Sequence, residues 1–222
     1  MSARDAILGR IRHGIARSEG TETQARATVT ARLKGRSRHL QPARIDLDRA
    51  ALIDLFVEKA QQVDATVSFV AIAEDVPEAV ADYLRGRNLP AEAAIAPHPD
   101  LDAMDWAAGT MTVHKRAPRD ADRIGINRAF GAVAETGTLV MASGGDSPAT
   151  MNFLPEIHIA IVRESEITGS CEDVWDRIRA RGPVPRTVNM VTGISRTGDI
   201  ELTVQTGVHG PRYLHIVVVR DD

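Results

Sequence analysis

Four glycine-containing turns carry most of the residues in this 222-residue chain that could do chemistry. The first is AETGT, residues 134–138, in which Glu135 precedes Gly137 by two positions. A carboxylate at such a turn can act as an acid, a base, a nucleophile or a hydrogen-bond acceptor, and the glycine lets the backbone approach a ligand closely. Glu135 is therefore a candidate catalytic residue, although a solvated carboxylate in a capped turn explains the same spacing.

The second turn, SGGDSPATMNFLP at residues 143–155, has the composition of an anion-binding loop. Ser143, Gly144 and Gly145 lead to Pro148, and proline is favoured at the first position of a helix. Free amide groups before such a helix can point at a negatively charged ligand. The spacing and the Lys-Ser/Thr pair of a Walker loop are missing, so the turn does not identify phosphate as the anion.

The third turn, TGISRTGDIE at residues 192–201, places Arg196 and Asp199 on either side of a glycine. An arginine can bind a carboxylate or a phosphate through two parallel hydrogen bonds, and an aspartate can orient it. A surface turn with a local Arg–Asp pair fits the same residues. Arg196 is therefore a candidate for ligand recognition or catalysis.

The fourth turn, GVHGPR at residues 207–212, holds His209 between Gly207 and Gly210. Histidine exchanges a proton near neutral pH, but a tight turn explains its position equally well. The catalytic candidates of the four turns are Glu135, Arg196 and His209. The ligand-binding candidates are Thr136, Gly137, Thr138, Ser143, Gly144, Gly145, Ser195, Thr197, Asp199, Gly207 and Gly210.

These turns stand at or next to the ends of predicted strands, where an open α/β sheet gathers its ligands. Helical and extended patterns alternate, and the segments HIAIV and LHIVVV are continuously apolar, as in a sheet covered on both faces. The pattern predicts an α/β fold, a layered sheet with helices on both faces. The main predicted helices span residues 48–63, 74–87 and 172–182, and the main predicted strands span residues 66–73, 156–162, 187–193 and 213–220.

The N-terminal part of the chain differs from the rest in charge. Up to Arg44 there are ten Lys or Arg residues against three acidic ones, which leaves about ten net negative charges on the remainder. The arginines are scattered and no aromatic residue interleaves them, which disfavours nucleic acid as a partner. We therefore predict an arm at residues 1–44, with a helix at 2–17 and a mobile connection after it, and an α/β domain at 45–222. The apolar stripe of the predicted helix is Ile7, Leu8, Ile11 and Ile15.

Several classes of site and location are disfavoured by the sequence. The single cysteine, Cys171, excludes an internal disulfide and a four-cysteine cluster held by this chain alone. The histidines show no zinc-binding spacing, and His158 and His215 lie inside apolar strands, where we expect core or sheet-edge residues. No GxGxxG follows a strand, which disfavours a nicotinamide cofactor. Without an apolar segment of membrane-spanning length or a secretory signal, a cytoplasmic location is expected.

Taken in order, AETGT, FLPEIHIAIV, TGISRTGDIE and GVHGPRYLHIVVV resemble the LUD family over roughly residues 45–220. The resemblance implies the NagB/RpiA/CoA-transferase-like fold, a layered α/β sheet. The CoA transferases of that superfamily carry a catalytic glutamate followed closely by a glycine at a strand-to-turn junction, and the run from Glu135 to Gly137 is similar. That similarity is an analogy, because fold alone does not transfer chemistry.

The resemblance also implies a function. It points to a subunit of an iron-sulfur-dependent system that oxidises L-lactate to pyruvate alongside two cysteine-rich partner proteins. The clusters would lie in the partners, and this chain, with no cofactor of its own, would contribute a pocket for a small carboxylate or another anion, or for docking. Relatives commonly have an arginine ahead of FLP, where this chain has Ala149, Thr150 and Asn152, so the cation of such a pocket would shift to Arg196 or Arg212 or be lost.

Two other functions are compatible with the residues. One is a stand-alone CoA-transferase-like or sugar-phosphate isomerase-like enzyme that uses Glu135 as a nucleophile or base. The other is a non-catalytic binding or regulatory module that recruits a partner or forms a homo-oligomer through the N-terminal helix. If the four turns build one site, Glu135, Ser143, Arg196 and His209 should converge on one cleft.

Overall fold

The computed structural model describes residues 2–15, 19–35, 38, 40–198 and 205–221. The chain divides into two compact units, Met1–Gln41 and Pro42–Asp222. The hydrophobic cores described for the chain draw their residues from the second unit. Any site that depends on a rigid scaffold is therefore to be sought in this unit.

The first unit contains α1, Ala3–Ile15, and α2, Glu19–Gly35. Helix α1 occupies the predicted N-terminal helix, and its Ile7 and Ile11 are about half exposed. Helix α2 lies in the segment that we predicted to be a mobile connection. Its apolar Val29 and Leu33 are exposed, and neighbouring turns support it locally, as in the ion pair at 2.9 Å between Glu22 and Arg26. A helix of this kind leaves no apolar stripe in the sequence.

The second unit is built on a parallel sheet of six strands in its described residues, in the order β1-β12-β7-β4-β2-β3. Because every pair is parallel, the carboxyl ends of these strands lie along one edge. Most of the strand residues are buried, which explains the continuous apolar runs in the sequence. The strands are β1 Ala65–Val70, β12 Tyr213–Val219, β7 Ile157–Arg163, β4 Ile124–Arg128, β2 Glu92–Ile95 and β3 Thr112–Lys115.

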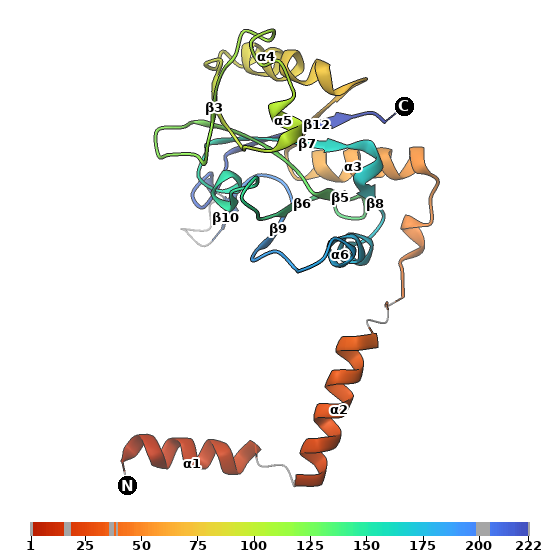
Figure 1. The fold of residues 1–222 in the computed structure, drawn as a ribbon, viewed down its shortest axis with the longest axis vertical. Helices are drawn as coiled ribbons and strands as arrows, with labels where there is room; N and C mark the ends of the chain where they lie inside the picture. The colour runs from red at the N-terminus through yellow and green to blue at the C-terminus, as the bar shows by residue number, and fades with distance from the viewer. Residues whose placement is uncertain (1, 16–18, 36–37, 39, 199–204, 222) are drawn as a thin grey trace. The chain divides into compact units, whose positions relative to one another are not determined.

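A smaller sheet, in the order β8-β5-β6-β9, forms a second layer. One face of the large sheet packs against α4, Val76–Gly86, and α5, Pro99–Asp102, whereas the other face packs against α3, Arg49–Gln62, and this smaller sheet. Helix α6, Cys171–Ala180, covers the far face of the smaller sheet (Figure 1). The predicted α/β class, with helices on both sides of a layered sheet, is confirmed. The strands of the smaller sheet are β8 Ile167–Thr168, β5 Gly131–Val133, β6 Thr138–Ala142 and β9 Val188–Val191.

Short elements complete the second unit. Strands β10, Arg196–Thr197, and β11, Gln205–Thr206, pair as an antiparallel ribbon. Two helices begin at side-chain caps: the Asp48 carboxylate accepts from the Ala51 backbone N–H before α3, and Ser170 and Asp173 form a capping box at α6. The 3₁₀ turns are η1 Ala43–Ile45, η2 Ala73–Asp75, η3 Ala149–Asn152 and η4 Glu164–Glu166.

His158 and His215 are core residues, as the sequence predicts. Both are almost completely buried, and burial lowers the pKa of each ring to about 4. His158 Nε2 lies 2.8 Å from Asn127 Oδ1, and His215 stacks on Tyr83 with the ring centres 3.9 Å apart. These contacts hold neutral rings inside the sheet.

Within the described part of the chain, none of the helices combines the length and the apolar content that crossing a bilayer requires.

Candidate functional site

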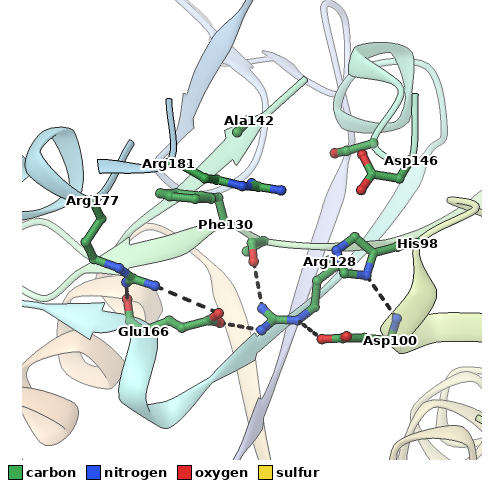
Figure 2. Close-up of a pocket in the computed structure, with 11 residues that line it drawn as sticks. His98, Asp100, Arg128, Phe130, Ala142, Asp146, Glu166, Arg177 and Arg181 are labelled. Carbon is green, nitrogen blue, oxygen red and sulfur yellow. Dashed lines mark hydrogen bonds and ion pairs between the residues drawn. The ribbon is translucent and has the colours of Figure 1, made fainter. Parts of the chain in front are cut away.

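A pocket lies at the carboxyl edge of the large sheet, between the ends of β4 and β2. The chain leaves β2 for β3 in one direction along the sheet and leaves β4 for β7 in the opposite direction. Such a switch point opens a crevice that usually holds the ligand of an α/β sheet. Arg128, the last residue of β4, and His98, which follows β2, both line the pocket, whose volume is about 250 Å³ (Figure 2).

The floor of the pocket is a buried arginine with its charge already balanced. The Arg128 side chain is only 6% exposed, and its guanidinium lies 2.5 Å from a Glu166 oxygen and 3.2 Å from Asp100. It also donates to the main-chain oxygen of Ala129 at 2.6 Å. Burial raises the pKa of Asp100, but the hydrogen bond from Arg128 and its charge outweigh this and lower it. Arg128 therefore holds β4, α5 and η4 together and has little capacity left for a ligand.

Two further arginines approach from α6. The guanidiniums of Arg177 and Arg181 each lie 5.4 Å from the centre of the Phe130 ring, within the range of a cation–π contact. Arg177 also donates to the main-chain oxygen of Glu166 at 2.9 Å. Arg181 has no carboxylate partner among the described residues, and its guanidinium extends over Phe130 into the pocket (Figure 2). It is the cation here that can pair with an anionic ligand.

The opposite wall comes from the loop after β6. Asp146 is half-buried and lines the pocket, and its carboxylate has no ion-pair partner in the described chain. The loop is closed by two main-chain hydrogen bonds between Gly144 and Ser147, at 3.1 and 3.3 Å. Arg181 and Asp146 approach the same space from opposite sides (Figure 2).

His98 adds a hydrogen-bond donor to the pocket. Its Nδ1 accepts from the Asp100 backbone N–H at 3.1 Å and so caps α5. In the neutral ring the proton therefore lies on Nε2, which remains able to donate. A cation, a free carboxylate and an imidazole N–H around one pocket suit a small acid that also carries a hydroxyl group. Arg181 would bind the acid group, Asp146 would accept the hydroxyl hydrogen, and His98 would donate to the hydroxyl oxygen.

The structure places only one of the four predicted turns at this pocket. Ser143, Gly144 and Gly145 precede Asp146 in the pocket wall, and the Ser143 hydroxyl accepts from the Thr187 backbone N–H at 2.9 Å. Glu135 lies at the other end of β6, and a strand of this length spans about 15 Å. There its carboxylate is 2.5 Å from the guanidinium of Arg44. The expected convergence of all four turns does not occur, because β6 separates Glu135 from Ser143.

The turn at Glu135 packs closely against α3. Gly137 has a φ of 65°, and a Cβ there would collide with the main chain of Lys59 and Ala60 in α3. The hydroxyl of Thr138 lies 2.7 Å from that of Thr136 and 2.7 Å from that of Thr192. These contacts join the first and third turns to α3, which explains their glycines and threonines without a ligand.

The third and fourth turns lie against each other. The Ser195 main-chain oxygen accepts from the Gly207 backbone N–H at 2.9 Å. The Ser195 hydroxyl oxygen accepts from the His209 backbone N–H at 3.3 Å. Arg196 pairs with Asp64 at the end of α3. His209, Gly207 and Gly210 line a cavity at the amino ends of the parallel strands, the opposite edge from the Arg128 pocket. Thr197 pairs with Gln205 in the β10–β11 ribbon, and Asp199 lies outside the described residues.

Cys171 begins α6 and is half-buried. Burial raises the pKa of its thiol, and the charges of Glu172 and Glu135 raise it further. This environment disfavours a thiolate. The described residues contain no group of three or more His, Cys, Asp or Glu side chains arranged to hold a metal ion.

The side chains that surround the pocket were not predicted, and of the predicted residues only Ser143, Gly144 and Gly145 belong to a loop of its wall. A charged residue ending the buried strand IGINR was an available signal for Arg128, because strand ends at the carboxyl edge are where ligands bind. The other residues come from separate segments with no common spacing. The residues that were not predicted are His98, Asp100, Arg128, Phe130, Asp146, Glu166, Arg177 and Arg181.

Comparisons with known proteins identify relatives. Residues 53–219 match the LUD domain. Lactate utilization protein C of Geobacillus kaustophilus is 33% identical over 130 residues, covering 53% of this chain and 54% of that protein. Lactate utilization protein C of Deinococcus radiodurans is 29% identical over 180 residues, covering 80% of this chain and 84% of that protein. The chain thus spans about half the length of some of the curated relatives it matches.

A solved structure shares the fold. The crystal structure of a DUF162 family protein from Deinococcus radiodurans has a TM-score of 0.57 and 24% sequence identity, covering 78% of this chain and 99% of that chain.

Proposed function

The chain belongs to the LUD domain family, and we propose that it serves lactate utilization as the component that binds the organic acid. The relatives named lactate utilization protein C support the process. The Arg128 pocket supports the role within it, because it offers a cation without a carboxylate partner at the usual ligand position of an α/β sheet. The observation that carries the proposal is Arg181, opposed by Asp146 across this pocket.

The proposal assigns a role to each free group. Arg181 binds the carboxylate of L-lactate, and Asp146 accepts the hydrogen of its hydroxyl group while His98 donates to the hydroxyl oxygen. Oxidation of L-lactate to pyruvate releases two electrons and two protons. Cysteine-rich iron-sulfur partner proteins in the cytoplasm take the electrons, since a chain with one cysteine cannot supply a four-cysteine cluster. Asp146 takes the hydroxyl proton and passes it to solvent, and the electron pair and the proton of the broken C2–H bond would leave to an acceptor that the partner proteins hold.

Growth and binding test the proposal together. Deletion of the gene should abolish growth on L-lactate but not on pyruvate, and the wild-type gene should restore it. Titration calorimetry should show L-lactate binding that Arg181→Gln weakens by at least about tenfold, because a hydrogen bond to a charged group is lost. Arg179→Gln is the matched control: Arg179 lies on the same helix but pairs with Asp176 at 3.3 Å, outside the pocket lining.

Two results would overturn the proposal. Growth on L-lactate at the wild-type rate after deletion would rule out a role in lactate utilization. Equal L-lactate affinity of wild type and Arg181→Gln would rule out the role assigned to the pocket. A CoA-transferase-like or isomerase-like activity through Glu135 receives less support, because that carboxylate is paired with Arg44 at the far end of β6.

A further inference from the structure

The Arg128 pocket continues into a second cavity. This outer cavity, of about 190 Å³, shares Phe130, Ala142, Asp146 and Arg181 with the inner pocket of about 250 Å³. Because they share these walls, the two cavities adjoin each other, and together they are called the cleft. Arg181 stands at the junction, where it can hold the head of a ligand whose remainder extends outward.

The size of the cleft exceeds what a three-carbon acid fills. Small-molecule sites usually measure about 300–1,000 Å³. The inner pocket alone falls below this range, whereas the two cavities together reach it. A ligand that contacts both ends is longer than L-lactate.

The outer cavity also has a different chemistry from the inner one. Apart from the shared Arg181 and Asp146, its lining is uncharged, with Ile178, Pro183 and Pro185 on one side. Ser143 there already uses its hydroxyl oxygen to accept from Thr187. An uncharged chain fits this end, and a second acid group would find no further cation in the lining.

We propose that the cleft takes 2-hydroxy acids with an unbranched carbon chain longer than that of L-lactate. The acid group binds Arg181, the hydroxyl group meets Asp146, and the chain lies along Phe130 toward Pro183 and Pro185. This assignment rests on the proposed function only in its use of Arg181 as the acid-binding group. It extends that function from one acid to a class defined by chain length.

A chain-length series tests the assignment on the full-length protein. Titration calorimetry with the L-isomers of lactate, 2-hydroxybutyrate, 2-hydroxyhexanoate and 2-hydroxyoctanoate should show rising affinity. A fully buried methylene improves binding about fourfold, so 2-hydroxyhexanoate should bind at least tenfold more tightly than lactate even with partial burial. Equal or falling affinity along the series would overturn the assignment.

A pair of neighbouring substitutions tests where the carbon chain of the ligand lies. Pro183 lines the outer cavity and is exposed, so Pro183→Asp places a charge beside the bound chain with little effect on folding. It should reduce the preference for 2-hydroxyhexanoate over lactate to about twofold or less. Val184→Asp adds the same charge one residue further along, outside the lining, and should leave the preference at tenfold or more. An equal preference for 2-hydroxyhexanoate over lactate in the two variants would show that the carbon chain of the ligand does not lie beside Pro183.

The outcomes separate this assignment from the proposed function. Lactate binding that depends on Arg181 but shows no chain-length preference leaves the function and overturns the assignment. Tight binding of the longer acids together with normal growth of the deletion strain on L-lactate supports the assignment and overturns the proposed function. If none of the four acids binds, both the assigned ligand class and the acid-binding role of the pocket are wrong.

Discussion

The two ends of the smaller sheet are built from the same strands but differ in what their side chains do. At the end beside the Arg128 pocket, Arg181 and Asp146 project into open space without carboxylate or cation partners in the described chain. At the end beside α3, the Glu135 carboxylate is paired with Arg44, and Gly137 lies against the α3 backbone. The first end has free groups and a cavity, and the second has satisfied groups and close packing.

This difference separates two reasons for a glycine-rich turn. The glycines at 137 and 193 have positive φ and would collide with α3 if they carried a side chain. Gly145, in the loop of the pocket, has open space around it. A turn motif therefore identifies a close approach of the backbone, and only the contacts show whether a ligand or a helix fills the space.

The largest expected effect is at the packed end. Gly137→Ala should lower the free energy of unfolding by about 3 kcal/mol or more, because the backbone at φ 65° disfavours a side chain and the methyl group meets main-chain atoms. Gly145→Ala, where a Cβ meets nothing within 4 Å, should change it by less than about 1 kcal/mol. Urea denaturation measures both. Similar losses for the two variants would erase the distinction between the ends.

The next effect concerns the floor of the pocket. Arg128→Met should lower the free energy of unfolding by about 3 kcal/mol, because it leaves the carboxylates of Asp100 and Glu166 near each other without their buried cation. Arg163→Met is the control, since Arg163 is 42% exposed and lies 3.6 Å from Asp100, a geometry that contributes less than about 1 kcal/mol. Guanidinium denaturation at pH 7 compares them. A loss as small as that of the control would show that Arg128 does not hold the pocket together.

The ion pair between Arg128 and Asp100 should make the stability of the protein depend on pH. Arg128 lowers the pKa of Asp100 below its ordinary value of 3.8, so the unfolded chain binds a proton here at a higher pH than the folded chain does. The stabilisation is therefore complete above pH 3.8 and is lost as the pH falls through the lower folded value. The difference in unfolding free energy between wild type and Arg128→Met should shrink as the pH is lowered from 3.8 to about 2. A difference that stays constant over this interval would contradict the pairing.

The smallest effect is expected at Glu135. Its partner Arg44 is 64% exposed, so Glu135→Gln should cost less than about 1 kcal/mol of stability. The substitution should also leave L-lactate affinity within twofold of wild type, because the pocket lies at the other end of β6. Calorimetry with Arg181→Gln as the positive control measures this. A loss of affinity in Glu135→Gln equal to that in Arg181→Gln would move the site to the packed end.

Most of the fold could be predicted from local pattern. The apolar runs at β7 and β12, the helical spacing of α3 and α6 and the capping residues at Asp48 and Ser170 each act over a few residues. Helix α2 could not be predicted in this way, since its apolar residues are exposed and its support is local charge pairing. Strand β9 falls within the strand predicted at residues 187–193, but its antiparallel pairing with β6 in a separate smaller sheet could not be predicted, because the two strands are far apart in the chain.

The site was harder to predict for a geometric reason. Arg128, Asp146 and Arg181 come from a strand end, a loop and a helix end that are far apart in the chain, and no spacing links them. The turn at Ser143–Gly145 was identified because its composition is a local property. Glu135 resembled a catalytic carboxylate for the same reason, and only the position of β6 shows that it lies away from the pocket.

A crystal structure with L-2-hydroxyhexanoate bound would locate the ligand itself. We expect electron density for the acid between Arg181 and Asp146, with its carbon chain directed toward Pro183. Density beside Arg44 and Glu135, with the Arg128 pocket filled only by water, would contradict this expectation.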